Sequence, residues 1–285
     1  MRFNERRKRF REAFAADRCV FPGSVYDPIS ARIAEDLGFE IGMFAGSIAS
    51  MTVLGAPDLI VLTLSEFADQ ARRIGRASAI PLMVDADHGY GNALNVRRTV
   101  EELEMAGVAG LSIEDTALPQ PFGSDGATIL LSVEEGVGKM KAALAGRTDP
   151  GLTIAGRTSA LSVTGVEDAI ERVRAYEAVG VDAVFLVGAK TRDQIDAVAA
   201  AVSVPIILGG TTPEIQDLDY LSARGVRLCL QGHQPFAAGV RAVYETLKAL
   251  REGTKPAELT GIADAALMAR VTRNAAYKAL IEETL

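Results

Sequence analysis

Two aspartates at the end of an apolar segment are the first residues of this 285-residue chain that could do chemistry. Residues 81–92 have the sequence Pro-Leu-Met-Val-Asp-Ala-Asp-His-Gly-Tyr-Gly-Asn. In a strand, Asp85 and Asp87 point to one side and Ala86 to the other. Mg²⁺ binds through one or two carboxylates and keeps waters that a substrate can displace. The pair therefore predicts a magnesium site, although Asp-x-Asp before a glycine turn is also a common capping or turn feature.

Other polar residues follow other short apolar segments. If these segments are parallel strands of a barrel, their C-terminal ends form one rim, where the chemistry of such barrels takes place. Acids, one arginine and one histidine would then converge, which favours the metal site over the capping feature. The residues at the expected strand ends are Ser24, Gly46, Ser47, Asp85, Asp87, Glu114, Asp115, Arg157, Gly188, Gly209, Gly210, Gly232 and His233.

The strands that must position these side chains alternate with helical patterns. Four times a helical pattern ends in a glycine that suits a left-handed cap and precedes an apolar run; these glycines are Gly38, Gly107, Gly180 and Gly225. The other four apolar runs lie at 19–23, 80–85, 152–157 and 204–209. Capping-box sequences predict helix starts at Thr63, Ser132 and Thr164, and Val166, Ile170, Val173 and Tyr176 share one helical face.

Eight apolar strands that alternate with helices predict an α/β fold, a closed (β/α)₈ TIM barrel. An open doubly wound sheet is the alternative, but no Gly-x-Gly-x-x-Gly follows the first strand. The length suits one barrel domain over 1–285. We expect an N-terminal amphipathic helix around 6–11, a last barrel helix at 236–251, and additional C-terminal helices in a tail from about 257 to 285, with Asp264 as an N-cap.

Composition excludes several classes of partner. The formal net charge is −7 and only 6–11 is densely basic, so we expect no nucleic-acid partner. The longest uncharged runs are broken by Gly, Ser, Thr and Pro, so we expect no membrane partner. The charged N-terminus lacks the apolar segment of a signal peptide. With two cysteines, Cys19 and Cys229, both inside apolar runs, we expect a cytoplasmic protein without disulfides.

Four motifs together resemble the isocitrate lyase and phosphoenolpyruvate mutase superfamily. They are Gly46-Ser47 with Pro57-Asp58, then 85–92, Ile113-Glu114-Asp115, and Ala155-Gly156-Arg157-Thr158. Within that superfamily, Arg157-Thr158, Gly232-His233 and Asn92-Ala93-Leu94-Asn95 are most similar to the oxaloacetate decarboxylase branch.

The resemblance implies a metal-dependent lyase with a defined assembly. The expected cofactor is Mg²⁺, with Mn²⁺ as a substitute, held directly by Asp85 and mostly through waters by Asp58, Asp87 and Glu114. The expected substrate is a small α-keto dicarboxylate. Contacts to it carry over to Ser47, Arg157 and His233. The eighth barrel helix is expected to be exchanged between subunits of a homotetramer that is a dimer of dimers.

The expected reaction is decarboxylation of oxaloacetate to pyruvate and CO₂ through a metal-stabilised enolate. Such a catalyst must hold negative charge on the keto oxygen more tightly in the transition state than in the substrate. Amide donors at Gly46 and Ser47 would assist as an oxyanion site. Arg157 would orient a carboxylate, and His233 would bind the substrate and govern reprotonation.

Departures from the superfamily pattern leave alternatives. Carbon-carbon lyases carry a Lys-x-Cys-Gly-His loop, whereas 115–126 contains no Cys, Lys or His. The decarboxylases have a Tyr-Gly-Asn stretch where this chain has 209–213, Gly-Gly-Thr-Thr-Pro, and Ala45 replaces a serine of many lyases. The alternatives are a 2-alkylmalate or methylisocitrate-type lyase, a phosphonopyruvate hydrolase, and a non-catalytic ligand-binding barrel.

Overall fold

A parallel sheet of eight strands forms the centre of the computed structural model, which describes residues 3–285. Each strand pairs with the next in sequence order, and hydrogen bonds of Val20 to Arg227 and Cys229 join the last strand back to the segment before the first. The predicted (β/α)₈ barrel is confirmed. The strands are β1 (Gly23–Ser24), β2 (Gly42–Ala45), β3 (Leu82–Asp85), β4 (Gly110–Glu114), β5 (Thr153–Thr158), β6 (Ala183–Leu186), β7 (Ile206–Leu208) and β8 (Val226–Cys229).

The first strand is shorter than predicted. Val20 makes only an isolated bridge to Leu228, and regular pairing with β2 starts at Gly23. Pro22 lies between them and has no N–H to donate, so the ladder cannot run through it.

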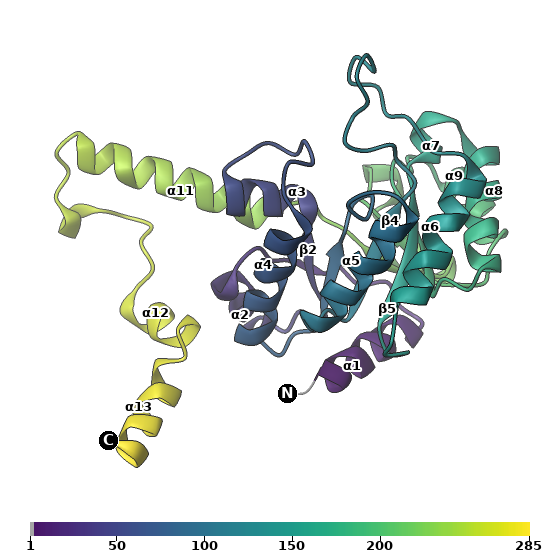
Figure 1. Ribbon diagram of the computed structural model, residues 1–285. Coiled ribbons are helices and arrows are strands. Elements are labelled where there is room, and N and C mark those ends of the chain that lie inside the picture. Colours follow the sequence, from purple (N-terminus) through teal and green to yellow (C-terminus); the bar gives the residue numbers. More distant parts are fainter. Residues whose placement is uncertain (1–2) are drawn as a thin grey trace.

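Helices surround the barrel (Figure 1). The four predicted glycine caps are confirmed, because Gly38, Gly107, Gly180 and Gly225 have φ between 75° and 97°. No helix of residues 3–285 is long and apolar enough to cross a bilayer. The helices up to β8, apart from the N-terminal one, are α2 (Pro28–Asp36), α3 (Gly46–Ala49), the π-helix η1 (Ser50–Leu54), α4 (Leu64–Ala77), α5 (Ala93–Met105), α6 (Val133–Gly146), α7 (Ala160–Val163), α8 (Val166–Ala178), α9 (Arg192–Ala199), the 3₁₀-helix η2 (Pro213–Ile215) and α10 (Leu218–Ala223).

One of the three predicted helix starts is wrong. Thr63 forms a capping box with Glu66, and Ser132 accepts from the Glu135 amide at the start of α6. Thr164, however, ends α7, because its amide donates to Ala160. A residue already in that helical turn cannot adopt the extended backbone of an N-cap, and α8 starts after Gly165.

The predicted N-terminal helix, α1 (Phe3–Ala15), closes one end of the barrel (Figure 1). Phe10 and Phe14 stack at 4.9 Å and join the cluster of side chains inside the barrel. The Arg7 guanidinium donates to the carbonyls of Val108 (3.0 Å) and Glu104 (2.7 Å). The opposite end, where the strands terminate, is left for a site.

The chain after β8 leaves the barrel. Helix α11 (Gln234–Arg251) projects outward and buries no residue (Figure 1). The 3₁₀-helix η3 (Pro256–Glu258) precedes α12 (Ala265–Val271) and α13 (Asn274–Thr284), as predicted for the tail. Asp264 is the predicted N-cap and accepts from the Leu267 amide (2.7 Å). Helix α12 returns to α2, where Arg32 donates to the Val271 carbonyl (3.1 Å).

Replacing Phe10 with alanine will lower the free energy of unfolding by about 3–5 kcal/mol, because the ring is fully buried and its loss leaves a cavity. Guanidinium-induced unfolding measures this. Phe122→Ala is the matched control, since Phe122 is fully exposed and its loss should change stability by less than about 0.5 kcal/mol. Equal stability of the two variants would show that α1 does not plug the barrel.

Candidate active site

Strand register places the predicted acids and the predicted arginine side by side. Asp85 ends β3, Glu114 ends β4, and Glu114 is paired in register with Arg157 of β5. The Arg157 guanidinium forms an ion pair with Asp85 and a second, at 3.3 Å, with Glu114. The structure therefore brings these three residues together at the open end of the barrel.

Neighbouring hydroxyls hold the two buried carboxylates in place. Ser112 donates to Asp85 Oδ1 (2.9 Å), and Thr116 donates to Glu114 Oε2 (2.8 Å). Ser112 lies two residues before Glu114 on β4 and points to the same side. That alternation is the sequence signal that could have identified Ser112, which was not among the predicted site residues.

Asp87 and Asp58 complete an excess of negative charge. Burial raises the pKa of Asp87 well above its usual value, and the charges of Asp85 and Glu114 raise it further. Asp58 lies in the exposed turn after Pro57, where burial of its carboxyl, followed by the charge of Asp85, raises its pKa. Burial also raises the pKa of Glu114. One guanidinium thus serves four carboxyl groups.

Gly46 gives Asp87 its place. A Cβ at residue 46 would overlap the Asp87 carboxylate. Asp87 itself has a left-handed backbone, with φ of 48°, which turns the chain directly after β3. Helix α3 begins at Gly46, so the amides of Gly46 and Ser47 lie in its first turn, which an α-helix leaves without internal partners.

Arg157 keeps its positive charge despite its burial. Burial opposes the charge, but Asp85 and Glu114 outweigh it and raise the pKa. The guanidinium carbon lies 5.5 Å from the centre of the Phe185 ring, and its Nε has no hydrogen-bond partner. Arg157 therefore has a donor left for an additional anion.

His233 faces the same site from the connection between β8 and α11. Its Nδ1 lies 3.1 Å from Ser24 Oγ and its Nε2 lies 3.1 Å from Ser47 Oγ. Burial lowers its pKa, and the charges of Asp85 and Asp58 act in the opposite direction. The ring is therefore neutral at neutral pH.

A cavity of about 180 Å³ brings these groups to one space, lined by Ser47, Asp85, Arg157, His233 and neighbouring residues. No three acidic, histidine or cysteine side chains of residues 3–285 are already gathered as a ligand shell. The donor set nonetheless fits one divalent cation held directly by Asp85, because hard oxygen ligands are in excess and Arg157 neutralises only part of the charge.

His88 and Tyr90 lie away from this cavity. His88 is buried, its carbonyl accepts from Lys139 (2.8 Å), and burial lowers the pKa of its ring to about 4. Tyr90 packs against Phe67 with ring centres 6.0 Å apart, as the sequence predicted.

The two segments that depart from the superfamily pattern differ in their relation to the site. The loop between β4 and α6 stands above the rim (Figure 1), with Phe122 fully exposed at its outer part. Gly209 lines the active-site cavity. Together with Gly210 and Thr211 it also borders a neighbouring cavity.

Comparison with known proteins agrees with this geometry. An oxaloacetate decarboxylase of Rhodopseudomonas palustris (strain BisB18) is 59% identical over 278 residues, covering 98% of this chain and 96% of the relative. A solved oxaloacetate acetylhydrolase bound to 3,3-difluorooxalacetate has a TM-score of 0.84 at 29% identity, covering 97% of this chain and 96% of that one. A phosphonopyruvate hydrolase bound to oxalate and Mg²⁺ has a TM-score of 0.85 at 27% identity, covering 98% and 99%.

The model of the phosphoenolpyruvate phosphomutase family matches residues 10–251, which is most of the chain and includes every residue of the rim described above. The resemblance seen in the sequence is thereby confirmed. This chain belongs to the phosphoenolpyruvate phosphomutase family.

Proposed function

We propose that this protein is a carboxy-lyase that decarboxylates oxaloacetate to pyruvate and CO₂ with the help of Mg²⁺. The observation that carries the proposal is the rim cluster of Asp85, Glu114 and Arg157, in which acids for a cation and a guanidinium for an anion share one small cavity. The 59% identity to a relative named oxaloacetate decarboxylase supports the choice of substrate.

Mg²⁺ fits the donor set better than a softer metal, because every candidate ligand is a carboxylate. Asp85 would hold it directly, and Asp58, Asp87 and Glu114 would act mostly through waters. Mg²⁺ supplies a Lewis acid that polarises the keto oxygen of the substrate. The Mg²⁺ and oxalate in the related phosphonopyruvate hydrolase structure support a divalent metal here.

The chain's own residues would bind and orient the substrate. Arg157 exchanges its ion pair with Asp85 for a bidentate contact to a substrate carboxylate, with Phe185 supporting its plane. The amides of Gly46 and Ser47 donate to oxygen that gains negative charge, and one such donor is worth roughly 2.7–4 kcal/mol where measured. His233 contacts the substrate and handles the proton that the product carbon receives.

The alternatives within the family have distinct products. A 2-alkylmalate or methylisocitrate-type lyase would release a second carbonyl or dicarboxylate fragment, and a phosphonopyruvate hydrolase would release phosphate. The loop at 115–126 offers no Cys, Lys or His to move a proton for the former or to meet a phosphonyl group for the latter. A non-catalytic barrel would release nothing.

Asp85→Ala should lower the rate of pyruvate formation from oxaloacetate with Mg²⁺ by about 100-fold or more, because the direct metal ligand is lost. A lactate dehydrogenase-coupled assay measures the rate above a protein-free blank. Asp69→Ala, an acid on the outer helix α4 that pairs with Arg73, is the control and should retain the full rate. Equal rates of wild type and Asp85→Ala would end the proposal.

Gly46→Ala should raise the Mg²⁺ concentration needed for half-maximal rate by about 10-fold or more, because the new Cβ displaces the Asp87 carboxylate. Titration of the pyruvate assay with Mg²⁺ measures this. Gly138→Ala is the control, since a Cβ there meets no atom within 4 Å. An unchanged Mg²⁺ requirement in Gly46→Ala would remove Asp87 from the metal site.

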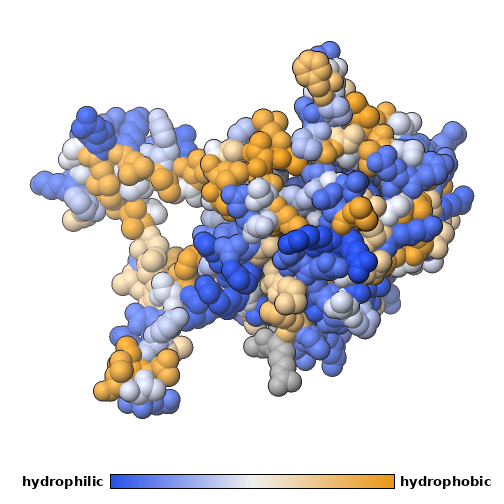
Figure 2. Space-filling view, in the orientation of Figure 1, coloured by the Kyte–Doolittle hydropathy of each residue, from blue (hydrophilic) through white to orange (hydrophobic). Residues whose placement is uncertain are grey.

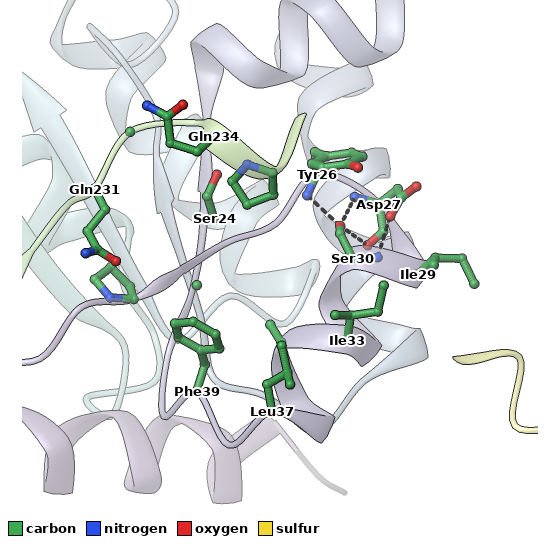
Figure 3. Close-up of a pocket in the computed structure, with 15 residues that line it drawn as sticks. Ser24, Tyr26, Asp27, Ile29, Ser30, Ile33, Leu37, Phe39, Gln231 and Gln234 are labelled. Atoms are coloured by element: carbon green, nitrogen blue, oxygen red, sulfur yellow. Dashed lines mark hydrogen bonds between the residues drawn. The ribbon is translucent and has the colours of Figure 1, made fainter. Parts of the chain in front are cut away.

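We also propose that α11 is exchanged between subunits of a homotetramer. Its side chains Val240, Val243, Tyr244, Leu247 and Leu250 are exposed and recur at helical spacing, and orange residues follow this arm in Figure 2. Beside β1 lies a cavity of about 530 Å³. Figure 3 shows Ile33, Leu37 and Phe39 gathered on one side of it. The α11 of a second copy would cover this apolar surface.

The double variant Val243→Asp with Leu247→Asp should lower the molar mass of the particle in solution, because two charges then face the apolar groove. Size-exclusion chromatography with light scattering measures the mass. Glu245→Gln, on the opposite face of the helix, should leave it unchanged. The same mass for the double variant and wild type would exclude α11 from the interface.

A further inference from the structure

His233 is held between hydroxyls from two successive strand ends. Ser24 ends β1 and lies 3.1 Å from Nδ1, while Ser47 follows β2 and lies 3.1 Å from Nε2. His233 itself follows β8, so this chain of three side chains crosses the seam between the last and first strands. Ser47 and His233 are predicted substrate contacts, whereas Ser24 has no role in the proposed reaction so far.

The neutral imidazole carries one proton on two nitrogens, so the chain has two polarities. In one, Nδ1–H donates to Ser24 and the Ser47 hydroxyl donates to Nε2. In the other, the Ser24 hydroxyl donates to Nδ1 and Nε2–H donates to Ser47. The second polarity alone leaves the Ser47 proton free for another acceptor.

The contents of the cavity favour the second polarity. Ser47 lines the cavity with Asp85 and Arg157, where an anionic substrate oxygen needs donors. Within residues 3–285, the Ser24 hydroxyl has no hydrogen-bond partner except His233 Nδ1. Its proton is therefore available to the ring.

We propose that Ser24 is a positioning residue that fixes His233 in the Nε2–H tautomer, so that the Ser47 hydroxyl donates its proton to the substrate carboxylate. The tautomer follows from the hydrogen bonds of this chain alone. The benefit to the substrate rests on the proposed decarboxylase function.

The tautomer can be measured directly because the chain has only two histidines, His88 and His233. Protein labelled with ¹⁵N in the imidazole rings gives two sets of ring signals by NMR, and His233→Asn assigns them. Wild type should show protonated Nε2 and bare Nδ1 for His233 at a pH where the ring is uncharged. Ser24→Ala should shift the population toward Nδ1–H, and Ser24→Thr should restore the wild-type pattern.

Two further variants keep the test decisive. Ser47→Ala should retain the Nε2–H tautomer, because Ser24 still donates to Nδ1. Ser162→Ala is the control, since that exposed rim hydroxyl bonds the Ser159 carbonyl and not His233. A wild-type Nδ1–H tautomer, no shift in Ser24→Ala, or a flip in Ser47→Ala would each overturn the assignment.

Kinetics then separate the tautomer from the proposed reaction. Ser24→Ala should raise KM for oxaloacetate about tenfold, with a smaller change in kcat, because one oriented donor to the carboxylate is lost. Ser24→Thr should recover KM. If no variant and no wild type forms pyruvate, the decarboxylase proposal fails while the NMR result still decides the role of Ser24.

Discussion

The arrangement of this site depends on the cost of placing several carboxylates together at the mouth of a barrel. Asp85 and Glu114 are buried, Asp87 is half-buried, and the residue that balances them is Arg157. A buried charge is tolerated only when it is paired or bound to a cation. The raised pKa values of Asp87 and Glu114 show that one guanidinium leaves the cluster short of positive charge. A divalent cation and an anionic substrate would together complete it.

The same constraint explains which parts of the site could be predicted from the sequence. In a closed parallel barrel the strand ends meet by necessity, so locating the strands also located Asp85, Glu114, Arg157 and His233. The glycines after the helices marked the strand starts, because their left-handed backbone is readable from residue type. The hydrogen-bond partners of the acids were not predicted. Serine and threonine are common in strands, and only the register shows that Ser112 faces Asp85.

Local sequence signals failed where tertiary structure decides. The capping sequence at Thr164 was overridden because the residue belongs to the preceding short helix α7. Pro22 shortened the first strand. Helix α11 was predicted as the last barrel helix, and its apolar stripe is that of a packed helix, yet in one copy of the chain it covers nothing. Because α11 begins directly after His233, the path of the arm and the position of a site residue are set by the same turn at Gly232, which has a φ of 75°.

The most direct test of the metal site is a crystal structure of the protein with Mn²⁺ in place of Mg²⁺ and with oxalate as a mimic of the product enolate. Anomalous scattering identifies the metal independently of the solvent. We expect one Mn²⁺ ion bound to the Asp85 carboxylate, oxalate on its open side, and Arg157 turned from Asp85 toward an oxalate oxygen. Anomalous density elsewhere, with Arg157 still paired to Asp85, would contradict a metal site at the mouth of this barrel.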